Sequence, residues 1–453
     1  MTKFSPAPSA ALFRTVWRWH FYAGLLVLPF IFFLSITGSI YLFKPQIDRW
    51  EESAWHGLSA ADRVSPDVQL AAALKAVPGG RFNSYRLPET SGDAAVLHLA
   101  LPGDSGMRDV AVAPDGRVIA LSNPDDRVTA WVARLHGSLL LGTPGSLIVE
   151  AAASWAIFLI LSGLYLWWPR GRGLAGVLWP RLDQGGRVRW RDLHAVTGFW
   201  VSGLALVMLA SGLPWGDGWA TGFRFIRSQM GWVNTPQDWR GGIDLHAGDL
   251  HARHDHQSMA AITPARGSAF GQITLSGIVE RASLEGMPFP ALLSPPGAKA
   301  RFGPGNGRYW KLTSEAQNRS VIRTVRYDAN SGTVIDRRGF ADKHVIDRII
   351  NYGIAWHEGQ LFGWINQAIG VITAAMLMLL AISGTIMWWR KRPSGTLGAP
   401  PALREPQARI ITALLVVLAI LLPVLGLSLL LFWLADQGIR VLLPGMAERL
   451  GRA

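Results

Sequence analysis

Four histidines of this chain occur as two pairs that are related by internal repeats. His136 and His357 are 221 positions apart, and His20 and His194 are 174 positions apart. Other residues repeat without gaps at these two offsets: Gly142 with Gly363, Ser162-Gly163 with Ser383-Gly384, Trp167-Trp168 with Trp388-Trp389, Gly24 with Gly198, and Thr37-Gly38 with Ser211-Gly212. Such repeats indicate duplicated pairs of helices. Because imidazole is an iron ligand and each histidine borders a long apolar segment, the chemistry to expect is haem ligation in a membrane.

The repeat also predicts which histidines act together. In an up-down-up-down four-helix bundle, the first and third helices lie diagonally across the core, as do the second and fourth. His20 and His194 begin the first and third apolar segments, whereas His136 and His357 precede the second and fourth. We therefore expect one haem between His20 and His194 at one membrane face, and a second between His136 and His357 at the other. Taken singly, each histidine has an alternative role as an interfacial anchor or helix cap.

Two glycines lie one helical turn beyond histidines. Gly24 and Gly198 follow His20 and His194 by four positions, on the same helix face, where a larger side chain would collide with a porphyrin. Close packing between membrane helices is the alternative role for them. The chain has no cysteine, which excludes iron–sulfur clusters and thiolate-bound or covalent haem, so two b-type haems are expected.

The composition is that of a membrane protein, with 49% hydrophobic and 17% charged residues among 453. Five apolar segments exceed the roughly 20 residues that a bilayer core requires. The fold class expected is an α-helical membrane protein with a duplicated four-helix transmembrane bundle, a fifth C-terminal span and two periplasmic α+β insertions. The predicted order is N-terminus and first span 1–43, first insertion 44–145, second span 146–168, basic loop 169–192, third span 193–215, second insertion 216–360, fourth span 361–389, basic loop 390–409, fifth span 410–434 and tail 435–453.

The net charge of +13 lies mainly on one side of these spans. The N-terminal segment and the two short loops hold fourteen basic and three acidic residues, which gives +11 of the +13. By the positive-inside rule the N-terminus and these loops are cytoplasmic, and both insertions and the tail after an odd number of spans are outside. Charge placed in this way suits membrane lipid and gives no reason to expect nucleic acid.

The two insertions read as small α+β modules. Residues 109–121 have the alternating pattern of two strands on either side of a Pro114-Asp115-Gly116 turn. Residues 324–335 have the same pattern around Asn330 to Gly332, so each segment predicts a hairpin. A helix is expected over 68–77. A scaffold role is the ordinary interpretation, and a substrate surface between the modules is the alternative.

Two further features could carry chemistry. Glu150 is the only acid within the predicted spans, and it is expected to be a proton-transfer residue, a neighbour of a haem propionate or an interfacial acid. The second insertion contains a polar tract suited to a divalent or ferric metal, with a solvated loop as the alternative. Its members are Asp244, His246, Asp249, His251, His254, Asp255 and His256.

Four segments carry a resemblance to a known family. They begin at Trp17, Arg134, Leu161 and His357 and read WRWHFYAGL, RLHGSLLLG, LSGLYLWWPR and HEGQLFG. The chain resembles the PepSY-associated transmembrane helix family over about residues 10 to 392. That family comprises iron-regulated bacterial inner-membrane proteins, among them ferrisiderophore reductases with two haems. The resemblance implies PepSY-like outer modules, haem ligation by the four histidines, and reduction of a ferric chelate on the periplasmic side.

Neither a dinucleotide-binding fingerprint nor a P-loop occurs, and the cytoplasmic loops are too short for a flavin or nicotinamide domain. Electrons are therefore expected from a separate donor, a flavoprotein or membrane quinol. Two functions remain: a di-haem reductase that passes electrons to a ferric siderophore and releases Fe(II), and a non-enzymatic scaffold whose modules bind a periplasmic partner such as a protease. A transporter is a third interpretation, disfavoured because no span is interrupted around a midplane site.

Overall fold

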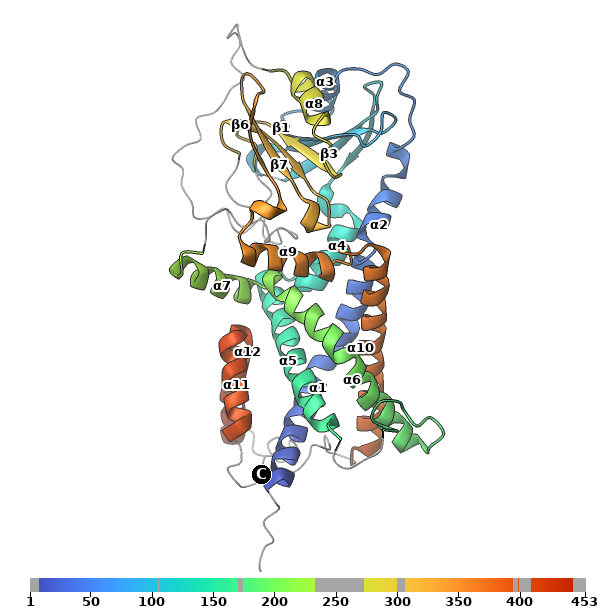
Figure 1. Ribbon diagram of the computed structural model, residues 1–453, viewed down its shortest axis with the longest axis vertical. Helices are drawn as coiled ribbons and strands as arrows, with labels where there is room; N and C mark the ends of the chain where they lie inside the picture. Colours follow the sequence, from blue (N-terminus) through green and yellow to red (C-terminus); the bar gives the residue numbers. More distant parts are fainter. Residues whose placement is uncertain are drawn as a thin grey trace, which may run out of the picture. The chain divides into compact units, whose positions relative to one another are not determined.

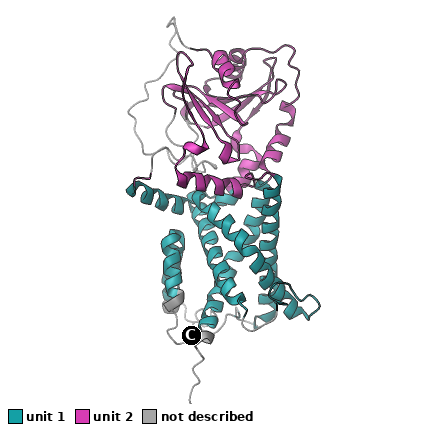
Figure 2. Ribbon diagram, in the orientation of Figure 1, with its two compact units in different colours: residues 1–42, 135–230, 364–453 teal, residues 43–134, 231–363 magenta. Residues whose placement is uncertain are grey.

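The structure is a computed structural model that describes residues 8–104, 106–169, 174–232, 273–299, 306–393, 398 and 409–442. The chain divides into two compact units built from alternating segments (Figure 2). Unit 1 comprises residues 1–42, 135–230 and 364–453, and unit 2 comprises residues 43–134 and 231–363. The predicted insertions, 44–145 and 216–360, thus correspond to unit 2, except that its first segment already ends at residue 134 and its second begins only at residue 231.

Four helices of unit 1 are long and apolar enough to cross a membrane, so the chain is a membrane protein. They are α1 (Pro8–Tyr41), α5 (Thr143–Trp167), α6 (Gly186–Gly212) and α10 (Trp364–Lys391) (Figure 1). Both α1 and α6 pack against α5 and α10. Therefore α1 and α6 occupy opposite corners of the bundle, which is the diagonal arrangement expected of four sequential helices.

The predicted single fifth span, 410–434, differs from the structure. The segment forms two shorter helices, α11 (Arg409–Leu421) and α12 (Pro423–Leu442), which are separated at Leu422. Pro423 cannot donate a backbone hydrogen bond to the preceding turn, so the helix is interrupted there. The chain bends so sharply that a Cβ placed on Gly426 would lie 3.2 Å from the Cβ of Ala419.

Helix α12 runs parallel to α5. At its start, Val424 lies beside Gly218, whose backbone binds Glu150 of α5. Farther along, Ser428 accepts a hydrogen bond of 2.9 Å from the indole of Trp155, which follows Glu150 on α5. The C-terminal helix therefore leads toward the end of unit 1 where α5 ends, and residues 410–434 do not form the single long helix that was predicted.

Unit 2 contains one antiparallel sheet of eight strands in the order β4-β3-β2-β1-β5-β6-β7-β8. The strands are β1 (Arg81–Arg86), β2 (Ala95–Ala100), β3 (Met107–Val112), β4 (Val118–Ser122), β5 (Ala291–Ser294), β6 (Tyr309–Ser314), β7 (Thr324–Asp328) and β8 (Val334–Arg338). The predicted hairpins are confirmed as β3–β4 and β7–β8. The two predicted modules are joined by pairing of β1 with β5, where Tyr85 faces Leu293.

Two helices pack on this sheet: α3 (Pro66–Ala76), where a helix over 68–77 was predicted, and α8 (Leu275–Ser283) (Figure 1). One apolar cluster includes residues of both helices and of both halves of the sheet, such as Ala73, Leu97, Ile278 and Leu312. The carboxylate of Asp67 in α3 accepts hydrogen bonds of 3.1 Å from two backbone N–H groups at the start of α8. Burial of one shared core explains why the two modules form a single unit.

Candidate functional site

His20 lies in α1 and faces α5. Its Nδ1 is 2.9 Å from the hydroxyl of Ser162. The next residue, Gly163, leaves room for the ring, because a Cβ there would lie 3.2 Å from His20 Cε1. The apolar helices α1 and α5 thus place an imidazole against a Ser-Gly pair.

His194 lies in α6 and makes the same contact with α10. Its Nδ1 is 3.1 Å from the hydroxyl of Ser383 and 3.2 Å from the carbonyl oxygen of Leu380. A Cβ on Gly384 would lie 3.4 Å from His194 Cε1. Ser383-Gly384 is the repeat of Ser162-Gly163, so the two halves of the bundle hold their histidines alike.

The structure places His20 and His194 on α1 and α6, the two helices at opposite corners of the bundle. Each ring is held through Nδ1 against a neighbouring helix, α5 for His20 and α10 for His194. Both side chains are half-buried, and within the described residues neither Nε2 has a hydrogen-bond partner. Two neutral imidazoles that present Nε2 from opposite corners fit the donor set of a bis-histidine haem.

His136 lies in the last turn of α4 (Val128–Ser138), which precedes α5. Its Nδ1 is 2.9 Å from the hydroxyl of Thr37 in α1, and a Cβ on Gly38 would lie 3.0 Å from its Cε1. The contact again involves a hydroxyl residue followed by glycine. Since Gly38 follows His20 by 18 positions, the two histidine contacts on α1 are roughly 27 Å apart at 1.5 Å per residue.

His357 is the last residue of α9 (Val345–His357), in unit 2. Its neighbour Glu358 is buried, which raises the pKa of that carboxyl, and the opposing attractions of Arg319 and Lys44 do not compensate. Glu358 was not among the predicted site residues. Its position directly after a repeated histidine was the available signal.

A comparison with protein-family models decides the family. The model of the PepSY-associated TM region matches residues 17–391. The chain belongs to that family. The residues that match the PepSY-associated TM family include the four spanning helices and unit 2. Helices α11 and α12 lie beyond the matched residues. A search of curated proteins found no match.

The two glycines predicted to adjoin a porphyrin contact neighbouring helices in this PepSY-associated TM protein. A Cβ on Gly24 would lie 3.9 Å from a methyl carbon of Leu159. A Cβ on Gly198 would lie 3.6 Å from a methyl carbon of Leu380. Both are ordinary packing distances. The structure therefore supplies evidence for the helix-packing alternative, and the porphyrin contact stays a prediction.

Glu150 has a structural role that was not among the alternatives considered. The carboxylate accepts hydrogen bonds of 3.0 and 2.8 Å from the backbone N–H groups of Gly218 and Trp219, at the start of α7 (Asp217–Gln229). A Cβ on Gly216 would lie 2.5 Å from Glu150 Oε2, so this approach requires glycine. An acid at a helix N-terminus satisfies free N–H groups and favours the helix dipole, so Glu150 fastens α7 to α5.

The histidine-rich tract from Asp244 to His256 lies outside the described residues. Among the residues that the structure does describe, no group of three or more metal-ligating side chains occurs. The possible metal site of His246, His251, His254 and His256 therefore stays a prediction.

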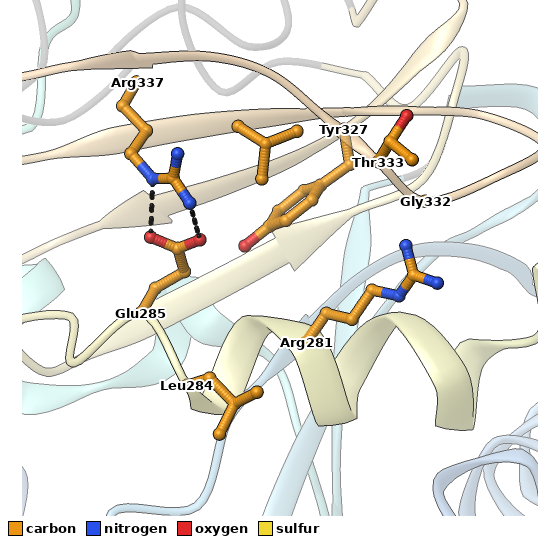
Figure 3. Close-up of a pocket in the computed structure, with 8 residues that line it drawn as sticks. Arg281, Leu284, Glu285, Tyr327, Gly332, Thr333 and Arg337 are labelled. Carbon is orange, nitrogen blue, oxygen red and sulfur yellow. Dashed lines mark hydrogen bonds and ion pairs between the residues drawn. The ribbon is translucent and has the colours of Figure 1, made fainter.

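A pocket of about 460 Å³ lies in unit 2 beside α8, β7 and β8 (Figure 3). Arg337 binds Glu285 on one side through hydrogen bonds of 3.0 and 2.8 Å. The hydroxyl of Tyr327 is buried and has no hydrogen-bond partner in the described part of the chain. Burial raises the pKa of this phenol, so it stays protonated and can only be a hydrogen-bond donor or a neutral acceptor. No predicted site residue lines this pocket.

Proposed function

We propose that this chain is a di-haem b-type reductase of the bacterial inner membrane. It would pass electrons from the cytoplasmic side or the quinol pool to a periplasmic ferric chelate, a ferrisiderophore, and release Fe(II). The supporting observation is that His20 and His194 lie on diagonal helices and are held alike through Nδ1, with Nε2 of each ring free of partners among the described residues. When bound, the two haems supply single-electron transfer.

The proposal assigns two ligand pairs within a duplicated four-helix bundle. His20 and His194 form the cytoplasmic pair, and His136 and His357 form the periplasmic pair. The structure supports the first pair by geometry. The second is taken from the 221-residue repeat together with the His136 contact at the far end of α1.

The orientation follows from charge. In the sequence the basic loops follow α5 and α10, and the positive-inside rule makes the side where these two helices end cytoplasmic. Unit 2 is then periplasmic. A hydrophilic ferric chelate cannot enter the bilayer, so it would accept electrons on that side. Reduction to Fe(II) weakens the coordination by hard oxygen ligands that holds ferric iron.

The first test is the visible spectrum of the purified protein. Reduced α-bands of b-type cytochromes are expected, whereas their absence would favour the non-enzymatic scaffold. His20→Ala and His194→Ala should each eliminate the same haem, and His136→Ala and His357→Ala should eliminate the other, so that haem content falls from two to about one per chain.

The control is His56→Ala, because His56 in unit 2 pairs with Asp93 at 2.9 Å and should leave both haems in place. If His20 and His136 variants lost the same haem, the assigned pairs would be wrong. Stopped-flow mixing of the reduced protein with ferric siderophores then tests the substrate. Reoxidation by a cupric salt or a quinone but by no ferric chelate would contradict the siderophore assignment.

A further inference from the structure

Three of the repeated histidines are held by a hydroxyl on a neighbouring helix. The Nδ1–hydroxyl distances are 2.9 Å for His20 and Ser162, 3.1 Å for His194 and Ser383, and 2.9 Å for His136 and Thr37. All three hydroxyl residues precede a glycine. Their recurrence at positions that the repeats relate makes a coincidence of packing a poor explanation.

Each hydroxyl proton already has an acceptor on its own helix. Ser162 donates to the Leu159 carbonyl at 3.2 Å, and Ser383 donates to the Leu380 carbonyl at 3.1 Å. Thr37 donates to the Phe33 carbonyl at 2.9 Å. Back-bonding of this kind is the usual arrangement of Ser and Thr inside a helix. A hydroxyl that has given its proton to a carbonyl can only accept from the imidazole.

This direction fixes the tautomer of the rings. Nδ1 must carry the proton, so Nε2 holds a lone pair. His194 supports the assignment independently, because its Nδ1 also lies 3.2 Å from the Leu380 carbonyl, which can only accept. Neutral imidazole with a lone pair at Nε2 is the form that ligates a metal.

We propose that Ser162, Ser383 and Thr37 are positioning residues that select the Nδ1–H tautomer and fix the rotation of each ring, so that Nε2 is presented to a haem iron. This inference rests on the proposed function. A ring that donates from Nδ1 is also more basic at Nε2, which favours the ferric state. The glycine that follows each hydroxyl residue lets the ring approach the partner helix closely enough to form the bond.

The test uses Ser162→Ala and Thr37→Val, which remove the hydroxyl, and Ser162→Thr and Thr37→Ser, which keep it. Ser154→Ala is the matched control, because Ser154 is fully buried in the same helix as Ser162 and its hydroxyl has no partner among the described residues. We measure haem affinity, the midpoint potential of each haem, the EPR g-values of the ferric protein, and the ¹⁵N shifts of the histidines in apo-protein.

We expect about a 10-fold loss of haem affinity and a higher midpoint potential in the variants without the hydroxyl, and wild-type behaviour in Ser162→Thr, Thr37→Ser and Ser154→Ala. Ser162→Ala should act on the haem lost in His20→Ala, and Thr37→Val on that lost in His136→Ala. If the wild type binds haem and Ser162→Ala behaves like Ser154→Ala, the inference is overturned and the proposed function stands. Protonated Nε2 in the apo-protein would also overturn it. Absence of haem from the wild type would refute the proposed function itself, and this inference with it.

Discussion

Alanine substitution of the glycines that face the imidazoles gives a graded prediction. The new Cβ would lie 3.0 Å from His136 Cε1 in Gly38→Ala, 3.2 Å from His20 Cε1 in Gly163→Ala and 3.4 Å from His194 Cε1 in Gly384→Ala. Ordinary contact begins at about 3.4 Å, so the ring and its helix must separate by about 0.4 Å, about 0.2 Å and almost nothing, respectively. Perturbation of the haem spectrum and loss of haem should follow that order.

The effect should be separable from helix stability. Alanine is favoured over glycine inside a helix by up to about 1 kcal/mol, so thermal unfolding of these variants in haem-free form should not shift downward from that of the haem-free wild type. Gly203→Ala is the control, because nothing lies within 4 Å of the new Cβ in α6. The assay is haem content and EPR line positions of protein purified under identical conditions. If Gly38→Ala behaved like Gly203→Ala, the imidazole of His136 would not be seated against α1.

Other expected outcomes concern the remainder of the chain. Glu150→Ala should destabilise the attachment of α7 by about 1.5–3 kcal/mol per lost charged hydrogen bond, seen as faster proteolysis within residues 217–229, whereas Glu150→Gln should lose less because it keeps an acceptor. Desolvation of the buried Asp109 carboxyl raises its pKa. The attraction of His98 and Arg127 outweighs this effect and holds the pKa below the usual value. The contribution of Asp109 to stability is therefore complete above about pH 4 and is lost as the pH falls through its lowered pKa. Hydrogen exchange of β2 and β3 should accelerate over that pH range. The acceleration should be smaller in Asp109→Asn, which has no carboxyl to titrate. A reporter fused after Ala453 should be active in its cytoplasmic form, because α12 returns toward the end of α5; a periplasmic signal would contradict that direction.

The length of the apolar segments, the alternation of residues around turns and the order of the helices were sufficient to predict the four spans, the hairpins and the diagonal arrangement. Each of these depends on local composition or on a rule for consecutive elements. The repeats also contained the Ser-Gly and Thr-Gly pairs, but nothing in their spacing indicated that they receive histidines from other helices. Contacts between helices depend on rotation about each helix axis, which apolar segments of nearly uniform hydropathy do not specify.

Two predictions, those for the fifth span and for Glu150, differ from the structure for identifiable reasons. Pro423 divides an apolar segment long enough to span, and hydropathy averaged over the segment conceals a single interruption. Glu150 was interpreted from its isolation among apolar residues, whereas its partners are backbone N–H groups, which every residue has and no sequence pattern reveals.

The pairing of β1 with β5 imposes an order on biosynthesis. Tyr85 and its partner Leu293 are 208 positions apart, and the residues between them include α5 and α6. Until β5 has been translated, the newly made β1 presents an unpaired edge and the first four strands lack part of the apolar cluster that α8 and the second half provide. Exposed strand edges of this kind recruit other chains. Nascent protein should thus depend on a chaperone during the interval in which two spanning helices are inserted. A chain terminated before residue 291 should be an aggregation-prone product and not a half-size folded domain.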